Sequence, residues 1–197
     1  ATAARLGHSV LLIDQKPRAR IGDKVCGEAV GRHHFDKLGI QPPKGEELAG
    51  SVVGINVASP DQKTVLRIKG EGLRGFTLNR LAFGQRLLNE ALDEGSELLD
   101  NTMVSEPIIR DKTVAGIRCR SVGKAENMQI GCKLLVDASG MNAVARRCAL
   151  PEWGVENGIL NEDLEILYME IREVQNIEDE EYLRIYLNQA VAPGGYR

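Results

Sequence analysis

The chain has 197 residues, of which 43% are hydrophobic and 27% are charged, a composition that provides enough apolar material for a globular core. A formal net charge of -3 gives no broad attraction for nucleic acid or for an anionic membrane, so neither partner is predicted from charge. The longest apolar runs, such as Val10–Ile13 and Leu134–Val136, are far shorter than the roughly 20 residues that span a bilayer, so no transmembrane segment is predicted.

The first residues predict the end of a helix followed by a buried strand. Ala1–Leu6 is rich in helix formers, and Gly7 is suited to end a helix in the left-handed conformation. Val10–Ile13 is a continuous, partly β-branched apolar run closed by Asp14, the pattern of a parallel strand buried on both faces. These features together predict half of a βαβ unit. Because the chain starts with Ala1 and no signal-peptide pattern follows, we expect it to continue a longer sequence.

A long loop, a hairpin and an amphipathic helix are predicted next. Gln15–Gly31 carries several glycines among charges and should be a loop that turns into a helix near Arg32–Leu38. The runs Val52–Ala58 and Thr64–Ile68, separated by turn-forming residues, predict a β-hairpin. Asn79 should cap a helix that carries Leu81, Gly84, Leu87, Leu88, Ala91 and Leu92 on one face and stops at Gly95.

The second half of the chain predicts further strands and a change of domain. Strands are expected at Met103–Arg110 and Val114–Arg120, joined by a turn, and a buried strand at Lys133–Asp137 that leads into a short helix through Arg146. After Pro151 the pattern changes, so a second domain is predicted to begin there. β-like runs are expected at Glu165–Arg172 and Tyr182–Asn188.

The cysteine and histidine spacings predict no metal site and no disulfide framework. Cys26, Cys119, Cys132 and Cys148 are widely spaced, which makes a reducing cytosol the default compartment. His33 and His34 are adjacent and face apart on a helix, so they are poorly placed to share a metal.

Several polar residues are candidates for a nucleotide site, each with a structural alternative. Asp14 ends a buried strand, where an acid can accept hydrogen bonds from ribose hydroxyls; it could equally be a plain strand-terminal acid. Asp137 lies where a predicted strand leads into a helix, a position that suits contact with a phosphate or a ribose. The alternative is an ordinary structural turn. Arg80 begins a helix, where the dipole disfavours a cation unless an anion is near; the alternative is a surface arginine.

The segment Cys26–Gly27–Glu28 lies in the long loop, where the glycine permits close approach of a flat ligand. A thiol with a reference pKa of about 8.5 is mostly protonated at neutral pH and could donate to such a ligand. The alternative is an inert buried cysteine, and the residues alone leave both readings open.

Six segments, in this order and over nearly the whole chain, resemble the geranylgeranyl reductase family of para-hydroxybenzoate hydroxylase-like flavoproteins, particularly its archaeal-type members: GHSVLLIDQK, KVCGEAVG, LNRLAFGQRLLNEALDEG, ELLDNTMV, KLLVDASGMNAVARR and APGGY. The first, third and fifth occur across many flavin monooxygenases and reductases, so they specify FAD and say little about the substrate. CGEAV and APGGY are the more specific pair.

The resemblance implies roles for single residues. The acid at Asp14 would hold the adenosine ribose, and the backbone at Val104 would contact adenine. Arg80 would lie near the diphosphate, and Asp137 would belong to a second nucleotide-contacting motif. The remaining matches concern the flavin and the substrate: Cys26, Gly27 and Ala29 would lie beside the flavin, and Tyr196 would belong to a substrate-domain motif.

The implied fold is α/β, with a FAD-binding Rossmann-like domain over residues 1–150 that is interrupted by the Val52–Ile68 hairpin. An antiparallel substrate domain would begin over residues 151–197. The glycine-rich phosphate loop of such domains is absent from the printed sequence and is expected upstream of Ala1. We therefore expect the 197 residues alone to bind FAD poorly and to be inactive.

The implied activity is FAD-dependent reduction of isolated double bonds of geranylgeranyl chains, in lipid or in diphosphate form. The electrons would come from an external donor, NAD(P)H or ferredoxin. Flavin N5 would deliver hydride and a proton would reach the neighbouring carbon, with Cys26 the candidate catalytic residue. The resemblance implies a cytoplasmic protein that contacts the membrane surface at its periphery.

Two other functions remain open. A flavin-dependent monooxygenase or halogenase shares the FAD motifs, although CGEAV and APGGY argue against it. A non-catalytic flavin- or lipid-binding protein would also fit the fold.

Overall fold

The computed structural model describes residues 1–187 except 125, 165–167, 172, 174 and 176–177. The chain divides into two compact units, each made of two stretches of sequence. The first unit comprises Ala1–Ile21 and Gln85–Ile166, and the second comprises Gly22–Gly84 and Leu167–Arg197. Residues 151–166 thus fall within the first unit, and the domain boundary near Pro151 stays a prediction.

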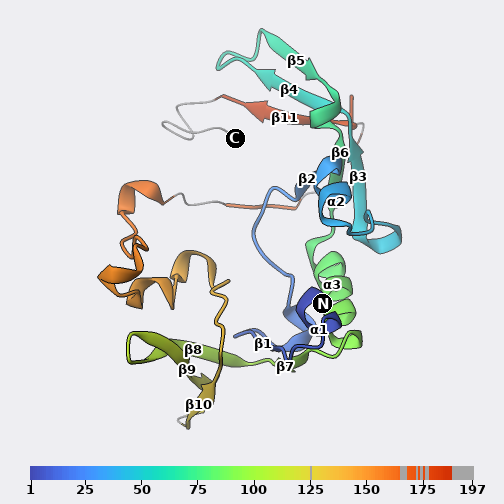
Figure 1. Cartoon of the computed structure of the whole chain (residues 1–197). Helices are drawn as coiled ribbons and strands as arrows, with labels where there is room; N and C mark the ends of the chain where they lie inside the picture. The colour runs from blue at the N-terminus through green and yellow to red at the C-terminus, as the bar shows by residue number, and fades with distance from the viewer. Residues whose placement is uncertain (125, 165–167, 172, 174, 176–177, 188–197) are drawn as a thin grey trace. The chain divides into compact units, whose positions relative to one another are not determined.

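The first unit contains a two-stranded sheet, a three-stranded sheet and short helices (Figure 1). Its elements are α1 (Thr2–Arg5), β1 (Leu11–Ile13), β7 (Glu97–Leu99), β8 (Thr102–Arg110), β9 (Thr113–Ser121) and β10 (Asn127–Gly131), with 3₁₀ turns at Arg18–Arg20, Gly140–Asn142, Arg146–Cys148, Pro151–Trp153 and Asn161–Asp163. The helix α3 (Arg80–Asp93) begins in the second unit and continues into the first.

Strand β1 confirms the predicted parallel strand. It pairs in parallel with β7, with Leu11 opposite Glu97 and Ile13 opposite Leu99. The predicted burial on both faces is wrong for the described chain, because Leu11 is 40% exposed and the rest of β1 is half-buried. Among the described residues β1 has a strand on one edge only, so its side chains are incompletely covered.

The predicted hairpin of β8 and β9 is confirmed and extended by a strand that sequence analysis missed. The sheet order is β10-β9-β8, which makes β8 an edge strand. Asp111 and Lys112 both have positive φ, of 47° and 62°, as a two-residue hairpin turn requires. Ile117 and Cys119 of β9 are 4% and 1% exposed and form the buried face of this sheet.

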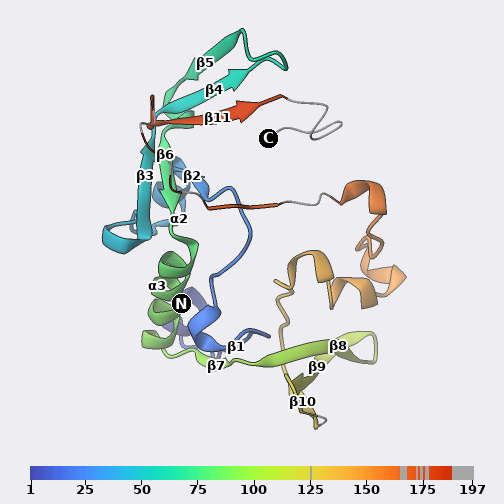
Figure 2. The same cartoon turned by 180° about the vertical axis from the view of Figure 1, so that it is seen from behind.

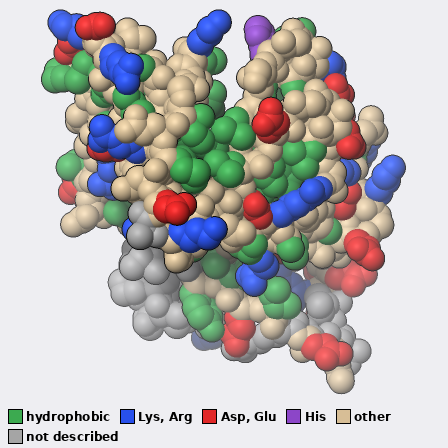
Figure 3. Space-filling view, turned by 90° about the horizontal axis from the view of Figure 1, so that it is seen from below, with side chains coloured by type: hydrophobic (Ala, Val, Ile, Leu, Met, Phe, Trp, Pro, Cys, Tyr) green, Lys and Arg blue, Asp and Glu red, His purple; other side chains and the backbone are tan. Residues whose placement is uncertain are grey.

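The predicted strand at Lys133–Asp137 is wrong for the described chain. The segment pairs with no described strand, and Leu134 and Val136 are 81% and 77% exposed. An apolar sequence that includes a β-branched residue favours extended backbone, but a strand also needs a neighbouring strand to which it can hydrogen-bond. Hydrophobic side chains are visible at the surface on the face drawn in Figure 3.

The second unit contains two three-stranded sheets, seen from both sides in Figures 1 and 2. Its elements are β2 (Ala29–Gly31), α2 (Arg32–Leu38), β3 (Leu48–Val52), β4 (Gly54–Ala58), β5 (Val65–Lys69), β6 (Gly75–Leu78) and β11 (Tyr182–Tyr186), with 3₁₀ turns at Gly45–Glu47 and Glu71–Leu73. The predicted α2 is confirmed, while β2, β3 and β6 were not predicted.

One sheet of the second unit joins the inserted hairpin to β11. Strands β4 and β5 pair antiparallel, which confirms the hairpin, and β11 pairs in parallel with β4. The sheet is therefore mixed rather than purely antiparallel. A Cβ on Gly54 would lie 2.9 Å from the ring of Tyr182 and 2.4 Å from the Ile68 carbonyl oxygen, so only glycine fits at this crossing.

The other sheet, of order β2-β6-β3, packs against α2 through aromatic side chains. The Phe35 ring lies 5.6 Å from Phe76 and 5.9 Å from Phe83, both in edge-to-face geometry. Leu78 of β6 is fully buried. This aromatic and aliphatic cluster is a core of the second unit.

The predicted helix with an Asn79 cap is confirmed as α3. The Asn79 Oδ1 atom accepts a hydrogen bond from the Ala82 N–H at 3.2 Å, and Gly95 beyond the helix end has φ of 93°. Residues 168–171 of the predicted run Glu165–Arg172 form no strand. The other residues of that run, 165–167 and 172, lie outside the described residues. No helix of the described chain has the length and apolar character that crossing a membrane requires.

Replacing Leu78 tests the core of the second unit. We expect Leu78→Ala to lower the free energy of unfolding by about 2 to 5 kcal/mol, because it leaves a cavity at a fully buried position. The control is Leu66→Ala, at a position that is 61% exposed, which should change stability by less than about 0.5 kcal/mol. Urea denaturation of both variants measures the difference, and equal effects would contradict the burial assignment.

Candidate functional site

Backbone hydrogen bonds tie the end of β1 to the start of β8. The Asp14 N–H donates to the Leu99 carbonyl at 3.2 Å, and the Asp14 carbonyl accepts from the Thr102 N–H at 2.9 Å. The Lys16 carbonyl accepts from the Asn101 N–H at 3.0 Å. The structure therefore brings Asp14 close to the strand that carries Val104, as a shared adenosine site would require.

The Asp14 carboxylate is half-buried and only partly engaged. Its Oδ1 atom accepts the Lys16 N–H at 2.8 Å, which fixes the side chain at the strand end. No other hydrogen bond to this carboxylate occurs within the described chain. The second oxygen can therefore accept hydroxyl hydrogens from a ligand.

Val104 lies in β8, opposite Cys119 of β9. Because β8 is the edge of its sheet, alternate N–H and C=O groups on its outer side pair with no strand among the described residues. A heterocyclic ring that carries a hydrogen-bond donor next to an acceptor can hydrogen-bond to the backbone groups of such an edge strand. The geometry is compatible with the backbone contact predicted for Val104.

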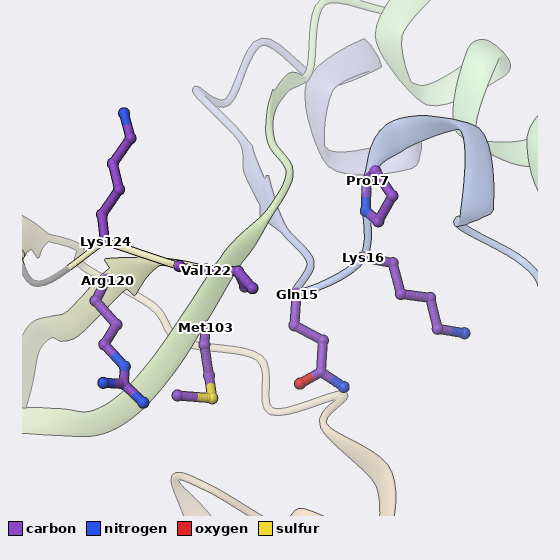
Figure 4. A pocket seen from close by; sticks show the side chains of 8 residues that line it. Gln15, Lys16, Pro17, Met103, Arg120, Val122 and Lys124 are labelled. Atoms are coloured by element: carbon purple, nitrogen blue, oxygen red, sulfur yellow. The ribbon is translucent and has the colours of Figure 1, made fainter.

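An open hollow with a volume of about 730 Å³ lies beside this junction. Its size is within the range of roughly 300–1,000 Å³ that is usual for small-molecule pockets. Figure 4 shows side chains of the loop after β1 on one side and side chains of β8 and β9 on the other. The lining residues are Gln15, Lys16, Pro17, Met103, Arg120, Val122, Gly123 and Lys124.

Asp137 organises the loop that follows the Lys133–Asp137 segment. Its Oδ1 atom accepts from the N–H of Ser139 at 3.0 Å and from the Ser139 hydroxyl at 2.6 Å. Its Oδ2 atom accepts from the N–H groups of Ala145 at 2.8 Å and of Arg146 at 3.0 Å. These four bonds use the roughly four acceptor positions of a carboxylate. The side chain has no acceptor left for a ligand in this arrangement.

These bonds also set the acidity of Asp137. Partial burial raises its pKa, but the hydrogen bond from the Ser139 side chain and those from the three backbone N–H groups together outweigh burial and lower the pKa to about 2. The carboxylate is therefore ionised at neutral pH and becomes protonated only as the pH falls toward that value.

In the second unit, the loop before β2 meets the first turns of α3. Gly22 has φ of 103°, and a Cβ there would lie 2.9 Å from the Gly84 Cα atom and 3.0 Å from the Arg80 carbonyl oxygen. Both the backbone angle and this close approach require glycine at position 22. The contact anchors one end of the loop that carries Cys26.

The other end of this loop is held by β2. Ala29 pairs with Thr77 of β6, and the Glu28 carbonyl accepts the Leu78 N–H at 2.9 Å. Between the two anchors, Cys26 is half-buried, and a Cβ on Gly27 would meet no atom within 4 Å. The space at Gly27 is therefore open to a ligand.

Arg80 is the first residue of α3 and is half-buried. Its guanidinium forms no ion pair within the described part of the chain, although the helix dipole disfavours a cation at this end. A bound anion would remove this unfavourable interaction.

The predicted site residues therefore fall into two groups. Asp14, Val104 and Asp137 belong to the first unit. The second unit holds the residues predicted beside flavin and diphosphate, namely Cys26, Gly27, Ala29 and Arg80. That the two groups form one site stays a prediction, and Tyr196 lies outside the described residues. No group of three or more His, Cys, Asp or Glu residues is arranged to hold a metal ion among the residues described.

Sequence analysis missed the residues that line the hollow. Gln15 and Lys16 directly follow Asp14, so their position beside a strand-end acid was a usable signal. Met103 and Arg120 meet only through the pairing of β8 with β9, which no local pattern reveals.

No protein-family model matches the chain. Among curated proteins, the chain is 41% identical over 194 residues to a digeranylgeranylglycerophospholipid reductase of Sulfolobus acidocaldarius, a match that covers 98% of this chain and 42% of the relative. It is 31% identical over 198 residues to digeranylgeranylglycerophospholipid reductase 2 of Methanococcoides burtonii, covering 99% of this chain and 46% of the relative. The chain thus spans less than half the length of these relatives.

Solved structures show the same fold. A geranylgeranyl bacteriochlorophyll reductase-like protein of Thermoplasma acidophilum matches 98% of this chain and 47% of its own with a TM-score of 0.73 at 22% identity. A myxobacterial FAD-dependent chondrochloren halogenase matches 74% of this chain and 35% of its own with a TM-score of 0.54 at 16% identity. These likenesses confirm the α/β flavoprotein-type fold, and the curated homologues confirm the resemblance to geranylgeranyl reductases.

Removing the charge of Asp137 tests its role in the loop. We expect Asp137→Asn to destabilise the loop by about 1 kcal/mol, which is below the usual range of about 1.5 to 3 kcal/mol for hydrogen bonds to a charged group because the residue is exposed. The folded pKa is below the ordinary value, so this stability is present above about pH 4 and is lost as pH falls toward about 2.

Amide hydrogen exchange at Ala145 and Arg146 measures this effect. Protection should decline between these two pH values in the parent chain and should be low and independent of pH in Asp137→Asn. Unchanged protection in the variant would show that the carboxylate does not hold the loop.

Proposed function

We propose that this chain supplies much of the FAD-binding framework of a reductase that saturates double bonds of geranylgeranyl chains in archaeal-type lipids. The observation that carries the proposal is the 41% identity to a digeranylgeranylglycerophospholipid reductase, which extends over 98% of the chain rather than over a single motif. The FAD-dependent halogenase shares the fold at 16% identity only, so it supports the flavoprotein framework without favouring halogenation.

The first unit fits the adenosine end of FAD. Asp14 has a carboxylate oxygen that can accept ribose hydroxyls, and the outer edge of β8 at Val104 offers backbone groups to adenine. The hollow beside them has the volume that such a group needs. Asp137 would act through its loop, by fixing the loop backbone with its saturated carboxylate rather than by contacting the nucleotide itself.

The second unit fits the diphosphate and the flavin. Arg80 would neutralise diphosphate charge at the start of α3, where it has no described ion-pair partner. The open space at Gly27, between Cys26 and Ala29, would admit the flavin ring. When bound and reduced, FAD would supply a hydride for one carbon of an alkene. A proton must then reach the neighbouring carbon, and the half-buried Cys26 thiol is the proposed donor.

The substrate would be a prenyl lipid or prenyl diphosphate, and an external donor, NAD(P)H or ferredoxin, would reduce the cofactor. Tyr196 would contact this substrate. Residues 1–150 would belong to the FAD domain and residues 151–197 to the start of the substrate domain. A long prenyl lipid resides in a membrane, so the whole protein would work at the membrane surface from the cytoplasmic side.

The function is tested with a protein that contains this chain and has the full length of its curated relatives. Its absorption spectrum should show bound FAD, and the reduced protein should add hydrogen to a digeranylgeranyl glycerophospholipid, detected by mass spectrometry as one H₂ per double bond. Oxygen-dependent hydroxylation or halogenation instead would identify a monooxygenase or halogenase. FAD binding without any reaction would indicate a non-catalytic flavoprotein.

Asp14→Ala in this full-length protein should weaken FAD binding by about 1 to 3 kcal/mol, because hydrogen bonds to a charged acceptor are lost. Equilibrium dialysis of FAD against the apoprotein measures the loss. The control is Glu97→Ala, which removes an exposed acid from the neighbouring strand β7 and should leave affinity unchanged. Equal FAD affinity in the Asp14 variant and the parent would remove the ribose role.

Cys26→Ser keeps the side chain nearly the same size while making it less acidic. We expect FAD to remain bound while the rate or extent of alkene reduction falls, because the change affects proton donation rather than cofactor contacts. Cys132→Ser, at another half-buried free cysteine, is the matched control and should react like the parent. A parental rate and extent in Cys26→Ser would make Cys26 a packing residue.

A further inference from the structure

The hollow beside β8 has a wall that the predicted site did not include. Met103 of β8 and Arg120 of β9 are direct cross-strand partners, and Asn127 of β10 is the next partner of Arg120. Side chains at such positions lie on the same face about 4.5–5.5 Å apart at Cβ. A thioether and a planar guanidinium therefore stand side by side at the edge of the hollow.

The lining side chains do not all point the same way. Figure 4 shows Gln15, Met103 and Arg120 projecting to the same side of the strands, whereas Lys124 projects to the opposite side. Arg120 of β9 and Lys124 of the turn that follows it therefore point in opposite directions. Of these two cations, Arg120 is the one that is oriented together with Met103 and Gln15.

The charge environment leaves Arg120 without an acidic partner in the described chain. Its neighbour on the same face of β9, Arg118, pairs with Glu106 of β8. Arg120 faces Met103 at the corresponding place, and is exposed. A guanidinium held beside a thioether, with no carboxylate opposite, is suited to stack on a planar π-system.

The other side of the hollow is formed by the residues that follow Asp14. The Gln15 side chain carries both a donor and an acceptor and lies one residue from the carboxylate that fits a ribose. A base joined to a ribose at Asp14 would have the edge of β8 beside it. Its ring face would then be within reach of Met103 and Arg120.

We propose that Arg120, supported by Met103, stacks on the adenine ring of the bound dinucleotide and makes the hollow selective for a purine. This inference rests on the proposed function, because it assigns the adenine end of FAD to this hollow. It adds a binding residue that neither the sequence motifs nor the named matches supply. The larger π-face of a purine should stack better than that of a pyrimidine.

The experiment uses AMP, the adenosine half of FAD, titrated into the flavin-free form of the full-length protein that contains this chain and followed by NMR or calorimetry. AMP should bind more tightly than CMP. Arg120→Leu should weaken AMP binding about 3- to 30-fold, the range for loss of a cation–π contact. Lys124→Leu removes the same charge from the same hollow but from the opposite direction, and should weaken binding less than about 2-fold because its field is screened.

Arg120→Lys separates stacking from charge. It keeps the positive charge but loses the planar guanidinium, so we expect it to resemble Arg120→Leu more closely than the parent. Parental affinity in Arg120→Lys would overturn the stacking proposal. Equal losses in the Arg120→Leu and Lys124→Leu variants, equal affinity for AMP and CMP, or no AMP binding would also overturn it.

Measurements on the full-length protein distinguish this inference from the proposed function. If that protein holds FAD and Arg120→Leu leaves its FAD affinity unchanged, the stacking inference fails and the flavoprotein proposal stands. If the protein holds no flavin but AMP binding still depends on Arg120, the flavoprotein proposal fails and the hollow is a site for another adenine nucleotide.

Discussion

The hydrogen bonds that close the end of β1 against the start of β8 are the constraint on which the proposed adenosine site depends. Asp14 uses its N–H and its carbonyl to bridge β7 and β8, and its side chain is fixed by the Lys16 N–H. The carboxylate, the edge of β8 and the hollow are then positioned by one junction. Because main-chain groups make most of this junction, its geometry depends on strand pairing more than on the identity of nearby side chains.

The elements that could be predicted from the sequence are those with strong local signals. Asn79 and Gly95 mark both ends of α3, and the hairpin of β8 and β9 has turn residues at Asp111 and Lys112. For such elements, the hydrophobic periodicity and the residues that end the element lie within one short stretch of sequence. Asp14 could be identified in the same way, because an acid at the end of an apolar run is a local pattern.

The elements that could not be predicted depend on partners distant in sequence. Strand β6 runs from Gly75 to Leu78, and its sheet neighbours, β2 and β3, are separated from it in the sequence by other elements. No short stretch of sequence therefore contains all the strands of this sheet. Conversely, Leu134 and Val136 have strand-like character without a described partner, and the predicted strand there is absent. Arg120 belongs to the same class, since its place at the hollow follows from cross-strand pairing with Met103.

The two acids at the candidate site differ in a way that composition and motif alone do not show. The Asp14 carboxylate accepts one hydrogen bond from the described chain, whereas the Asp137 carboxylate accepts four and has a pKa of about 2. A carboxylate with spare acceptor capacity can exchange water for ligand hydroxyls at little cost, while a saturated one would first have to break its loop apart. Asp14 is therefore suited to direct contact and Asp137 to preorganisation. Acids of similar appearance in the sequence therefore differ in the physical roles that their hydrogen bonds leave open to them.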